Sequence, residues 1–271
     1  MIRRLQKCDG ERVREIVKTI WEGDDYIPHV FEKWVEDPSC HFMGLWKDGT
    51  LVGIDNLRLL SDKVGWMEGM RIDPALQGKG FGKELGKQTL AIAKRIGLER
   101  LYFATYFDNT ASIRMNEAFG FNRIGVFTNL ESEIGDISDS SFAFNVDSEI
   151  PEILDQVSED WAFLPKEIPD KARFLIQPTR IHDGDNWAVL SKNSKSESCV
   201  DINYISIAEE RKARSFVHGL KCYAQSKGFE RVHTMVREDL DLEPFLYNGF
   251  KPFERVRDVF LYFADSSVLE I

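Results

Sequence analysis

The stretch VGWMEGMRIDPALQGKGFGKELG, residues 64–86, decides the fold of this chain. Its apolar run at 64–72 predicts a strand, and Asp73-Pro74 ends it because proline fixes its own φ and lacks the N–H group that a sheet needs. Three glycines, at positions 78, 80 and 82, come next, directly before a predicted helix at 83–95. Glycine lets the backbone approach a ligand closely, and the first N–H groups of a helix are free to bind an anion. The stretch therefore predicts a phosphate-binding loop, with a tight turn carrying incidental glycines as the alternative.

Two familiar nucleotide-binding motifs do not fit this loop. A Walker loop has serine or threonine after its Gly-Lys pair, and here Gly78-Lys79 is followed by Gly80. A Rossmann fingerprint reads Gly-x-Gly-x-x-Gly, which the glycine spacing here does not match. The pattern Gln-x-x-Gly-x-Gly does fit, with Gln77, Gly80 and Gly82. It resembles the pyrophosphate loop of the Gcn5-related N-acetyltransferases, the GNAT family, which bind acetyl-coenzyme A.

A second motif and the order of the predicted elements resemble the same family. Residues 109–121, NTASIRMNEAFGF, are similar to the family segment Asn-x-x-Ala-x-x-x-Tyr-Glu-x-x-Gly-Phe. The chain predicts a strand, two helices, three antiparallel strands, the glycine loop with its helix, and then a strand, a helix and further strands. This is the order of the acyl-CoA N-acyltransferase (GNAT) fold, an α/β fold with a mixed sheet. The resemblance covers residues 1–144.

The second half of the chain repeats parts of the first. AKRIGLERL at 93–101 is echoed by AQSKGFERV at 224–232. FGF at 119–121 is echoed by NGF at 248–250. The repeats predict a second copy of the fold, although a strand-helix-strand echo can also arise by chance in an α/β protein.

The second copy is predicted to lack the cofactor loop. Residues 208–214, where that loop would stand, contain no glycine and carry two glutamates, which repel phosphate at the mouth of a helix. We therefore predict a catalytic GNAT domain at 1–144 and a degenerate GNAT-like domain at 145–271. One cofactor per chain follows from this division.

The resemblance implies direct transfer of an acetyl group from acetyl-CoA to a neutral amine. Backbone groups of Met70 and Ile72 would pair with the pantetheine arm, and Asn109 would contact the same arm. Seven consecutive loop residues would hold the pyrophosphate, with Lys79 or Lys83 adding positive charge: Gln77, Gly78, Lys79, Gly80, Phe81, Gly82 and Lys83.

Glu68 is the candidate base. It precedes Gln77 by nine residues, where many family members carry a strand glutamate that takes the proton of the amine. Strand alternation predicts that its side chain shares a face with Trp66 and Met70. The alternative is a structural carboxylate paired with Arg71 or a lysine.

The usual proton donor of the family is missing. The family tyrosine falls at Asn116, and an amide cannot serve as the acid for the leaving thiolate. Tyr106, at the end of the neighbouring predicted strand, is the candidate replacement, with a packing role as the alternative. Water or the substrate could also supply the proton.

The acceptor site is predicted in the loop between the first two helices, which usually forms one wall of the acceptor pocket in this family. Its candidates are Trp21, Asp25 and Tyr26, because acids beside aromatic rings suit an ammonium or imidazolium group. The run DYIP at 25–28 also resembles histidine N-acetyltransferase-like proteins. We expect an N-acetyltransferase for a small-molecule amine or an amino acid. Alternatives are a protein or peptide N-acetyltransferase and a non-catalytic acetyl-CoA sensor.

Composition limits the partners. The 271 residues carry a formal net charge of -10, which argues against nucleic acid or an anionic membrane as a partner. The four cysteines and five histidines show no metal-binding spacing, so no metal is expected. The charged N-terminus and the lack of a long apolar run predict a cytoplasmic protein. A homodimer is possible, and the sequence does not decide it.

Overall fold

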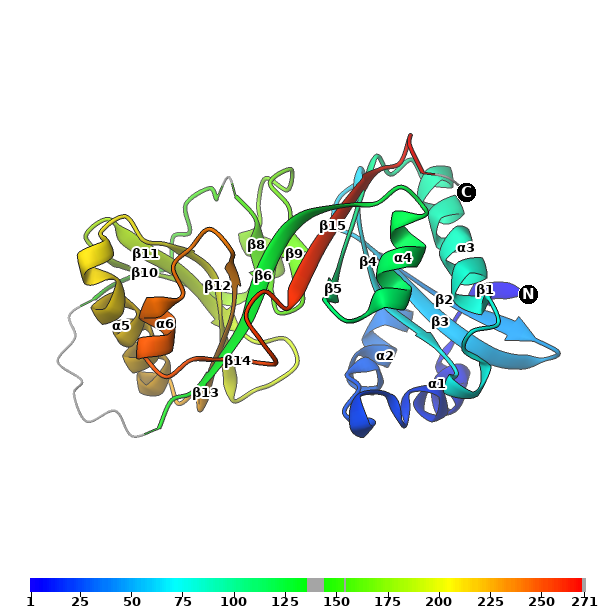
Figure 1. The fold of residues 1–271 in the computed structure, drawn as a ribbon, viewed down its shortest axis with the longest axis horizontal. Helices are drawn as coiled ribbons and strands as arrows, with labels where there is room; N and C mark the ends of the chain where they lie inside the picture. The colour runs from blue at the N-terminus through cyan, green and yellow to red at the C-terminus, as the bar shows by residue number, and fades with distance from the viewer. Residues whose placement is uncertain (136–143, 154, 270–271) are drawn as a thin grey trace. The chain divides into compact units, whose positions relative to one another are not determined.

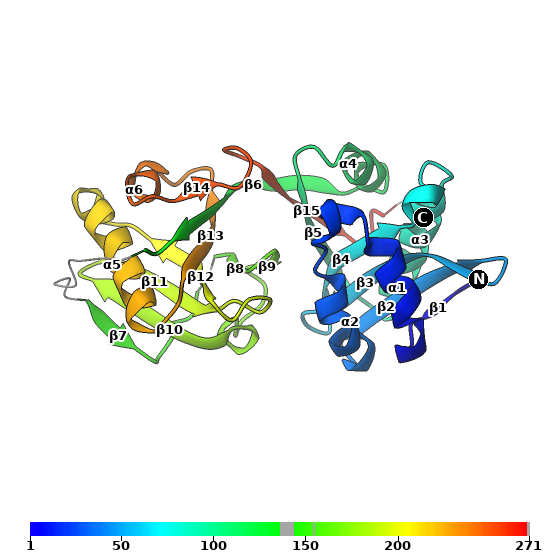
Figure 2. The same cartoon turned by 90° about the horizontal axis from the view of Figure 1, so that it is seen from below.

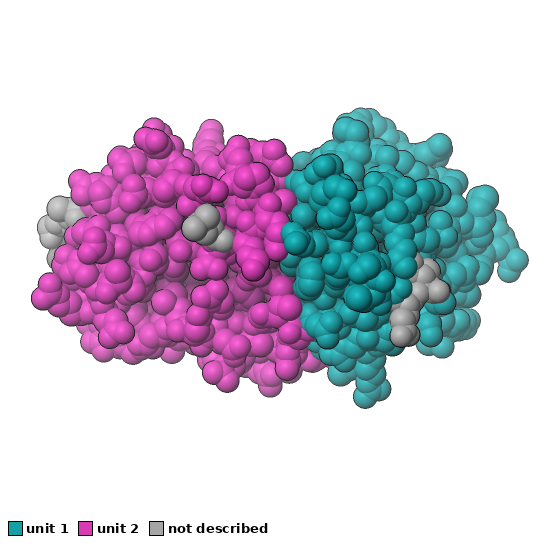
Figure 3. Space-filling view, turned by 90° about the horizontal axis from the view of Figure 1, so that it is seen from above, with its two compact units in different colours: residues 1–103, 109–122, 262–271 teal, residues 104–108, 123–261 magenta. Residues whose placement is uncertain are grey.

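The computed structural model describes residues 1–135, 144–153 and 155–269. The chain forms two compact units, coloured in Figure 3. Unit 1 comprises residues 1–103, 109–122 and 262–271, and unit 2 comprises residues 104–108 and 123–261. The predicted boundary after residue 144 therefore differs from these units, because residues 123–135 belong to unit 2 and the last strand returns to unit 1. The assignment of one domain as catalytic and the other as degenerate stays a prediction.

The sheet of unit 1 is mixed. Strands β1 to β4 are antiparallel neighbours, and β4 and β5 are parallel. Figure 1 shows the strands of this unit, whose order is β1 (Ile2–Arg4), β2 (Cys40–Lys47), β3 (Thr50–Leu59), β4 (Val64–Ile72), β5 (Arg100–Tyr106) and β15 (Val259–Asp265).

Helices cover both faces of this sheet, as Figure 2 shows. Val13 and Phe31, from the first two helices, pack against Phe42 on one face, whereas Leu85 of α3 packs against Leu45 on the other. The helices of unit 1 are α1 (Gly10–Val17), α2 (Ile27–Glu36), α3 (Phe81–Arg95) and α4 (Thr110–Glu117), with single 3₁₀ turns at Lys7–Asp9, Ile20–Gly23 and Pro74–Leu76.

Strand β4 carries one extra residue opposite β3. Three steps along β4, from Glu68 to Arg71, match two steps along β3. Gly69 lies in this bulge with φ +72°, and a Cβ there would come within 2.8 Å of the Trp34 ring. Both the left-handed φ and the close approach of Trp34 require glycine at this position.

β4 and β5 separate soon after they begin. They pair only at Val64–Trp66 with Arg100–Tyr102. Among the described strands of unit 1, none pairs with the β5-facing edge of β4 beyond Trp66. An extended ligand could therefore hydrogen-bond to that edge as an added strand does.

The last strand of the chain completes the sheet of unit 1. From Tyr262 on, β15 belongs to unit 1 and lies next to β5. Tyr262 stacks on Phe103 with ring centroids 4.9 Å apart, and its hydroxyl donates a hydrogen bond of 3.0 Å to Glu117 Oε1. The Ser266 N–H donates to the Glu99 carbonyl at 2.8 Å. Residues far along the chain are thus part of the N-terminal unit.

Unit 2 is built around its own mixed set of strands. Phe216 and Leu220 of its long helix pack on Ile202 and Val232 of the sheet. Its main strands are β6 (Asn122–Glu133), β13 (Arg231–Arg237), β12 (Cys199–Ser206), β11 (Asn186–Lys192), β10 (Ile176–Asp183) and β7 (Asn145–Asp147), with β14 (Lys251–Pro252) on β6. The remaining elements are the pair β8 (Val157–Glu159) and β9 (Ala162–Leu164), the helices α5 (Ala213–Ser226) and α6 (Glu243–Tyr247), and 3₁₀ turns at Ala172–Phe174 and Glu210–Lys212.

Unit 2 repeats the element order of unit 1. Three antiparallel strands lead to a helix and then to a strand parallel to the third one, as β2-β3-β4-α3-β5 in unit 1 and β10-β11-β12-α5-β13 in unit 2. The parallel pairs begin at Val64 with Arg100 and at Cys199 with Arg231. The predicted second copy of the fold is confirmed.

Candidate functional site

The glycine loop has the backbone geometry of an anion cradle. Gly78 and Gly80 have φ of +76° and +82°, and a Cβ on either would meet nothing within 4 Å. The left-handed backbone, and not crowding, therefore requires glycine at both positions. The first bond of α3 runs from the Glu84 N–H to the Gly80 carbonyl at 3.0 Å. The N–H groups of residues 81–83 precede it, and these are the groups that a helix leaves for an anion.

The charges and space around this loop fit a pyrophosphate. Lys79 lies between Gly78 and Gly80, and Lys83 follows Gly82 in the first turn of α3. Gln77 reaches back over the loop, where its Nε2 donates to the Ile72 carbonyl at 3.4 Å. The predicted loop residues are thus together, with open space where the phosphates of the cofactor would lie.

The other predicted cofactor contacts have structural partners of their own. Asn109 caps α4, because its Oδ1 accepts from the Ser112 N–H at 3.3 Å. The Met70 carbonyl accepts from Arg71 Nη1 at 3.0 Å. Met70 and Ile72 both lie on the stretch of β4 that β5 leaves unpaired, as a strand-like ligand requires.

Glu68 lies where β4 parts from β5, in a polar group that the sequence did not predict. Its Oε1 is 3.4 Å from Asn56 Nδ2 and 3.5 Å from Arg58 Nε, and the side chains of Glu68 and Arg58 are 17% and 18% exposed. Arg58 and Asn56 lie on β3, opposite Trp66 and Glu68. The ion-pair partner of Glu68 is therefore Arg58 and not Arg71 or a lysine, and the role of Glu68 as the base stays a prediction.

The prediction that Glu68 and Met70 share a face is also wrong. A Cβ on Gly86 of α3 would lie 3.5 Å from Met70 Cε, so Met70 faces α3. Glu68 lies on the opposite face with Asn56, whose Nδ2 reaches Cys40 in the core under α1 and α2. The bulge at Gly69 reverses the alternation between the two side chains.

A buried ion pair occupies the predicted acceptor loop. Asp25 Oδ2 lies 2.6 Å from Arg71 Nε, and Oδ1 accepts from the Ile27 N–H at 2.9 Å. The Asp25 side chain is 1% exposed. Its carboxylate is therefore already neutralised by Arg71, and a direct contact with a cationic acceptor stays a prediction.

The aromatic residues of this loop differ in exposure. Trp21 is 48% exposed and has φ +51°. Tyr26 packs edge-on against Trp34 at 5.9 Å between ring centroids, and the Arg71 guanidinium lies 5.7 Å from its ring. The loop thus presents one exposed indole and one ring fixed beside the ion pair.

Tyr106 belongs to unit 2 and has the contacts of a packing residue. Its ring lies 4.6 Å from Trp161 and 6.0 Å from Phe253, between ring centroids. Its hydroxyl accepts from Asn129 Nδ2 at 3.4 Å, and burial raises the pKa of the phenol well above its usual value. A role for Tyr106 as the acid stays a prediction.

Asn116, at the family tyrosine position, is buried. Its Nδ2 donates to the Ser112 carbonyl at 3.0 Å, and its Oδ1 has no hydrogen-bond partner among the described residues. Neither atom can protonate a thiolate as an acid does.

Asp55 is a further buried carboxyl that the sequence did not indicate. It lies on the α3 side of β3, is 1% exposed, and accepts a 2.6 Å hydrogen bond from Thr89 Oγ1. Burial raises its pKa to about 7. The signal in the sequence was a carboxyl directly after the apolar run at 51–54 of this strand.

The counterpart of the glycine loop in unit 2 is already satisfied internally. Asn186 Oδ1 accepts from the N–H groups of Ala208 and Glu209 at 2.9 and 2.8 Å. Glu209 is held by Lys212 at 3.0 Å. These contacts occupy two N–H groups ahead of α5, and residues 208–214 contain no glycine, which supports the predicted loss of the cofactor site.

Two further findings concern metal binding and membrane-spanning helices. In the described part of the chain, no group of three or more histidine, cysteine, aspartate or glutamate side chains is placed to hold a metal ion. Over the same residues, no helix has the length and apolarity needed to cross a membrane.

Comparison with known proteins agrees with this geometry. Residues 10–121 match the model of the acetyltransferase (GNAT) family. The chain is 30% identical over 126 residues to N-alpha-acetyltransferase RimI of Mycobacterium tuberculosis, covering 45% of this chain and 78% of that protein. It is 32% identical over 94 residues to spermine/spermidine N(1)-acetyltransferase of Bacillus subtilis, covering 31% of this chain and 62% of that one.

The tandem arrangement also has a structural neighbour. A tandem GNAT protein from the clavulanic acid biosynthesis pathway matches 98% of both chains with a TM-score of 0.62, at 14% sequence identity. This likeness shows the fold of the whole chain. Together with the family match and the glycine loop, it leads to one conclusion: the chain belongs to the GNAT family of acetyltransferases, enzymes that use acetyl-CoA.

Proposed function

We propose that this chain transfers an acetyl group from acetyl-CoA to the primary amine of a small molecule or an amino acid, with unit 1 carrying the reaction. The observation behind the proposal is the position of Glu68, a carboxylate two residues beyond the last β4–β5 pair. Asn56 and Arg58 hold it there. A proton acceptor at the point where the strands separate is what the attack of an amine requires.

The chain's own residues would divide the work as follows. When bound, acetyl-CoA supplies the acetyl group as an activated thioester. The N–H groups of residues 81–83 and the backbone at Gly78 and Gly80 would hold its pyrophosphate, with charge from Lys79 or Lys83. Backbone groups of Met70 and Ile72 would align its pantetheine arm, with Asn109 nearby.

Glu68 would take the proton that the amine loses, directly or through a water molecule. Arg58 keeps a positive charge 3.5 Å from the receiving carboxylate, and Asn56 fixes its orientation. The thiolate also needs a proton. Since Asn116 cannot supply it and Tyr106 is packed against Trp161, we assign this proton to water or to the acceptor.

The acceptor would approach from the loop between α1 and α2. Trp21 and Tyr26 would offer it aromatic surface, and Asp25 would act by holding Arg71 in place. Similarity to a polyamine acetyltransferase supports a small amine. Similarity to RimI, which is named for an N-alpha-acetyltransferase activity, favours a peptide N-terminus as the second candidate. We also propose that the protein acts in the cytoplasm.

Thiol release from acetyl-CoA tests the proposal against a panel of amino acids, polyamines and short peptides. We expect turnover with at least one small amine. Turnover with peptides alone would favour the second candidate, and tight cofactor binding with no turnover would favour an acetyl-CoA sensor. Glu68→Gln should lose most of kcat while its affinity for acetyl-CoA is unchanged. Glu36→Gln, at an exposed position on α2, is the matched control, and equal rates in the two variants would remove Glu68 from the reaction.

A further inference from the structure

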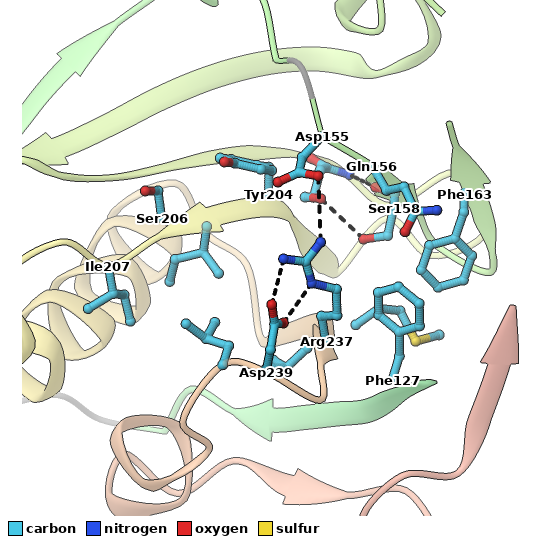
Figure 4. Close-up of a pocket in the computed structure, with 15 residues that line it drawn as sticks. Phe127, Asp155, Gln156, Ser158, Phe163, Tyr204, Ser206, Ile207, Arg237 and Asp239 are labelled. Atoms are coloured by element: carbon cyan, nitrogen blue, oxygen red, sulfur yellow. Dashed lines mark hydrogen bonds and ion pairs between the residues drawn. The ribbon is translucent and has the colours of Figure 1, made fainter. Parts of the chain in front are cut away.

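Unit 2 contains a cavity of about 290 Å³ where its own parallel strands separate (Figure 4). β12 and β13 pair only at Cys199–Ile202 with Arg231–Thr234. The cavity opens beyond this pairing, between the ends of the two strands and the segment around Ser158. Its volume is at the small end of ligand pockets, which span about 300–1,000 Å³.

The inner end of the cavity has a buried acceptor atom without a donor. Asn203 is 3% exposed and lines the cavity. Its Nδ2 donates to the Ser158 carbonyl at 2.8 Å, whereas its Oδ1 has no hydrogen-bond partner among the described residues. A buried carbonyl oxygen that has lost its water is unfavourable, so a ligand that donates a hydrogen bond there would be stabilised.

Asn203 is also the counterpart of Glu68. Glu68 lies four residues after Val64, the first residue of the parallel pair in unit 1, and Asn203 lies four residues after Cys199 in unit 2. Both strands carry a bulge next to this position. Unit 2 therefore presents an amide where unit 1 presents its candidate base, and its cavity can bind without accepting a proton.

The outer end of the cavity is acidic. Arg237 forms a bidentate pair with Asp239, at 2.6 and 2.7 Å, and a longer pair with Asp155 at 3.5 Å. One positive charge against two negative charges leaves a net charge of about -1 at this end. Figure 4 shows all three side chains together at the cavity.

Apolar side chains line the space between these two ends. Phe127, Phe163 and Met235 are all buried and all line the cavity. Figure 4 shows the two phenylalanine rings next to one another, and their centroids are 4.4 Å apart. The cavity thus combines an acceptor inside, apolar walls, and an acidic outer end.

We propose that unit 2 is a non-catalytic binding site for a small amine that also carries a hydroxyl or N–H group. That donor bonds to Asn203 Oδ1, the apolar part of the amine packs on the aromatic walls, and the ammonium group lies beside Asp155 and Asp239. Coenzyme A is not the ligand we propose, because residues 208–214 contain no glycine and place Glu209 and Glu210 just before α5. The site is independent of whether unit 1 acetylates a small amine or a peptide.

Three probes test the contributions of the two ends of the cavity separately, in calorimetric titrations of the full chain. Tyramine has a phenol and an ammonium group, phenethylamine lacks the phenol, and 3-(4-hydroxyphenyl)propionate has a carboxylate in place of the ammonium. We expect tyramine to bind most tightly. Losing the hydroxyl should weaken binding about tenfold, and the carboxylate probe should bind more weakly still.

Two variants locate the binding in unit 2. Asn203→Leu should weaken tyramine about tenfold and leave phenethylamine nearly unchanged. Asp155→Asn changes an exposed side chain, which keeps the test valid if Asn203→Leu fails to fold, and should weaken both amines about threefold. Asp170→Asn, at an exposed position of the same unit, should have no effect. No saturable tyramine binding, or binding that Glu68→Gln abolishes and Asp155→Asn leaves unchanged, would overturn the assignment.

Discussion

Replacing Asp55 with asparagine should stabilise the protein at neutral and alkaline pH. The carboxyl is fully buried on β3, and burial raises its pKa from 3.8 to about 7. Since the folded pKa lies above the unfolded one, the folded state holds this proton more tightly. In the parent, the stabilisation of the folded state by this proton is complete below about pH 4 and is lost as the pH rises to about 7. Asparagine has the same shape and does not titrate.

The size of the effect follows from the shift in pKa. A difference of about 3 units, at about 1.4 kcal/mol per unit, amounts to about 4 kcal/mol. The free energy of unfolding of Asp55→Asn minus that of the parent should therefore increase by about 1.4 kcal/mol per pH unit between about pH 4 and pH 7. Above that range the difference should stay constant.

Two measurements check this prediction. Urea unfolding of the parent, Asp55→Asn and the exposed control Asp62→Asn across this pH range gives the difference directly. Carboxyl ¹³C NMR gives the titration midpoint of Asp55 itself. Parallel stability curves for the parent and Asp55→Asn, or a midpoint near that of an ordinary aspartate, would refute the reasoning.

Three further predictions concern the loop, the ion pair and a buried histidine. Gly80→Ala should cost about 1 kcal/mol of stability and weaken acetyl-CoA binding, measured by calorimetry. The control Gly49→Ala, at φ +79° in a hairpin turn, should cost the same stability without changing acetyl-CoA binding. Equal affinities of the two variants for acetyl-CoA would contradict the role of the loop. Arg71→Met should cost about 3 kcal/mol in urea unfolding, because it leaves the Asp25 carboxylate buried alone. A double variant with Asp25→Asn should recover most of that, and no recovery would contradict the pairing. Burial lowers the pKa of His233, but the hydrogen bond to Asp201 and the negative charges of Asp201, Asp160 and Glu131 together raise it more, so the net pKa is raised. The contribution of His233 to the free energy of unfolding should therefore be full below about pH 6.5 and decline as the pH rises through the folded pKa. His233→Gln should remove this decline. If the variant keeps the decline, another group causes it.

The glycine loop and the repeat could be predicted because their signals are local. A positive φ at Gly78 and Gly80 is a property of single residues, and three glycines before a helix reveal it. The repeat at 93–101 and 224–232 marks the end of a helix and the start of a strand in each unit, so it is visible in a linear comparison. The family motifs then fixed the fold of the first half.

The environment of Glu68 could not be predicted for a physical reason. Which residues lie beside it depends on the register between β3 and β4, and the bulge at Gly69, which begins just beyond Glu68, turns Met70 to the other face. A glycine inside a strand is a signal for a bulge, but it does not say in which direction the neighbouring side chains turn. Arg58 therefore appeared as a partner only in the folded structure.

The return of β15 to unit 1 could not be predicted, because the strand pairing that decides it is not local. Nothing within residues 259–265 distinguishes a strand that joins β5 from one that stays with its neighbours in sequence. Contacts made in the folded chain, such as those of Tyr262 with Phe103 and Glu117, assign the segment from Tyr262 on to unit 1.

The return of β15 to unit 1 determines when the acetyltransferase unit can finish folding during synthesis. About 150 residues separate β5 from its neighbour β15, so this contact is among the latest that the ribosome makes available. Until then the Phe103 ring and the β5 edge lie uncovered on the nascent chain, as sites for chaperones or for a strand from another copy. Completion of unit 1 thus waits for unit 2 to be translated, and a premature stop before Tyr262 would leave a glycine loop on an unfinished sheet.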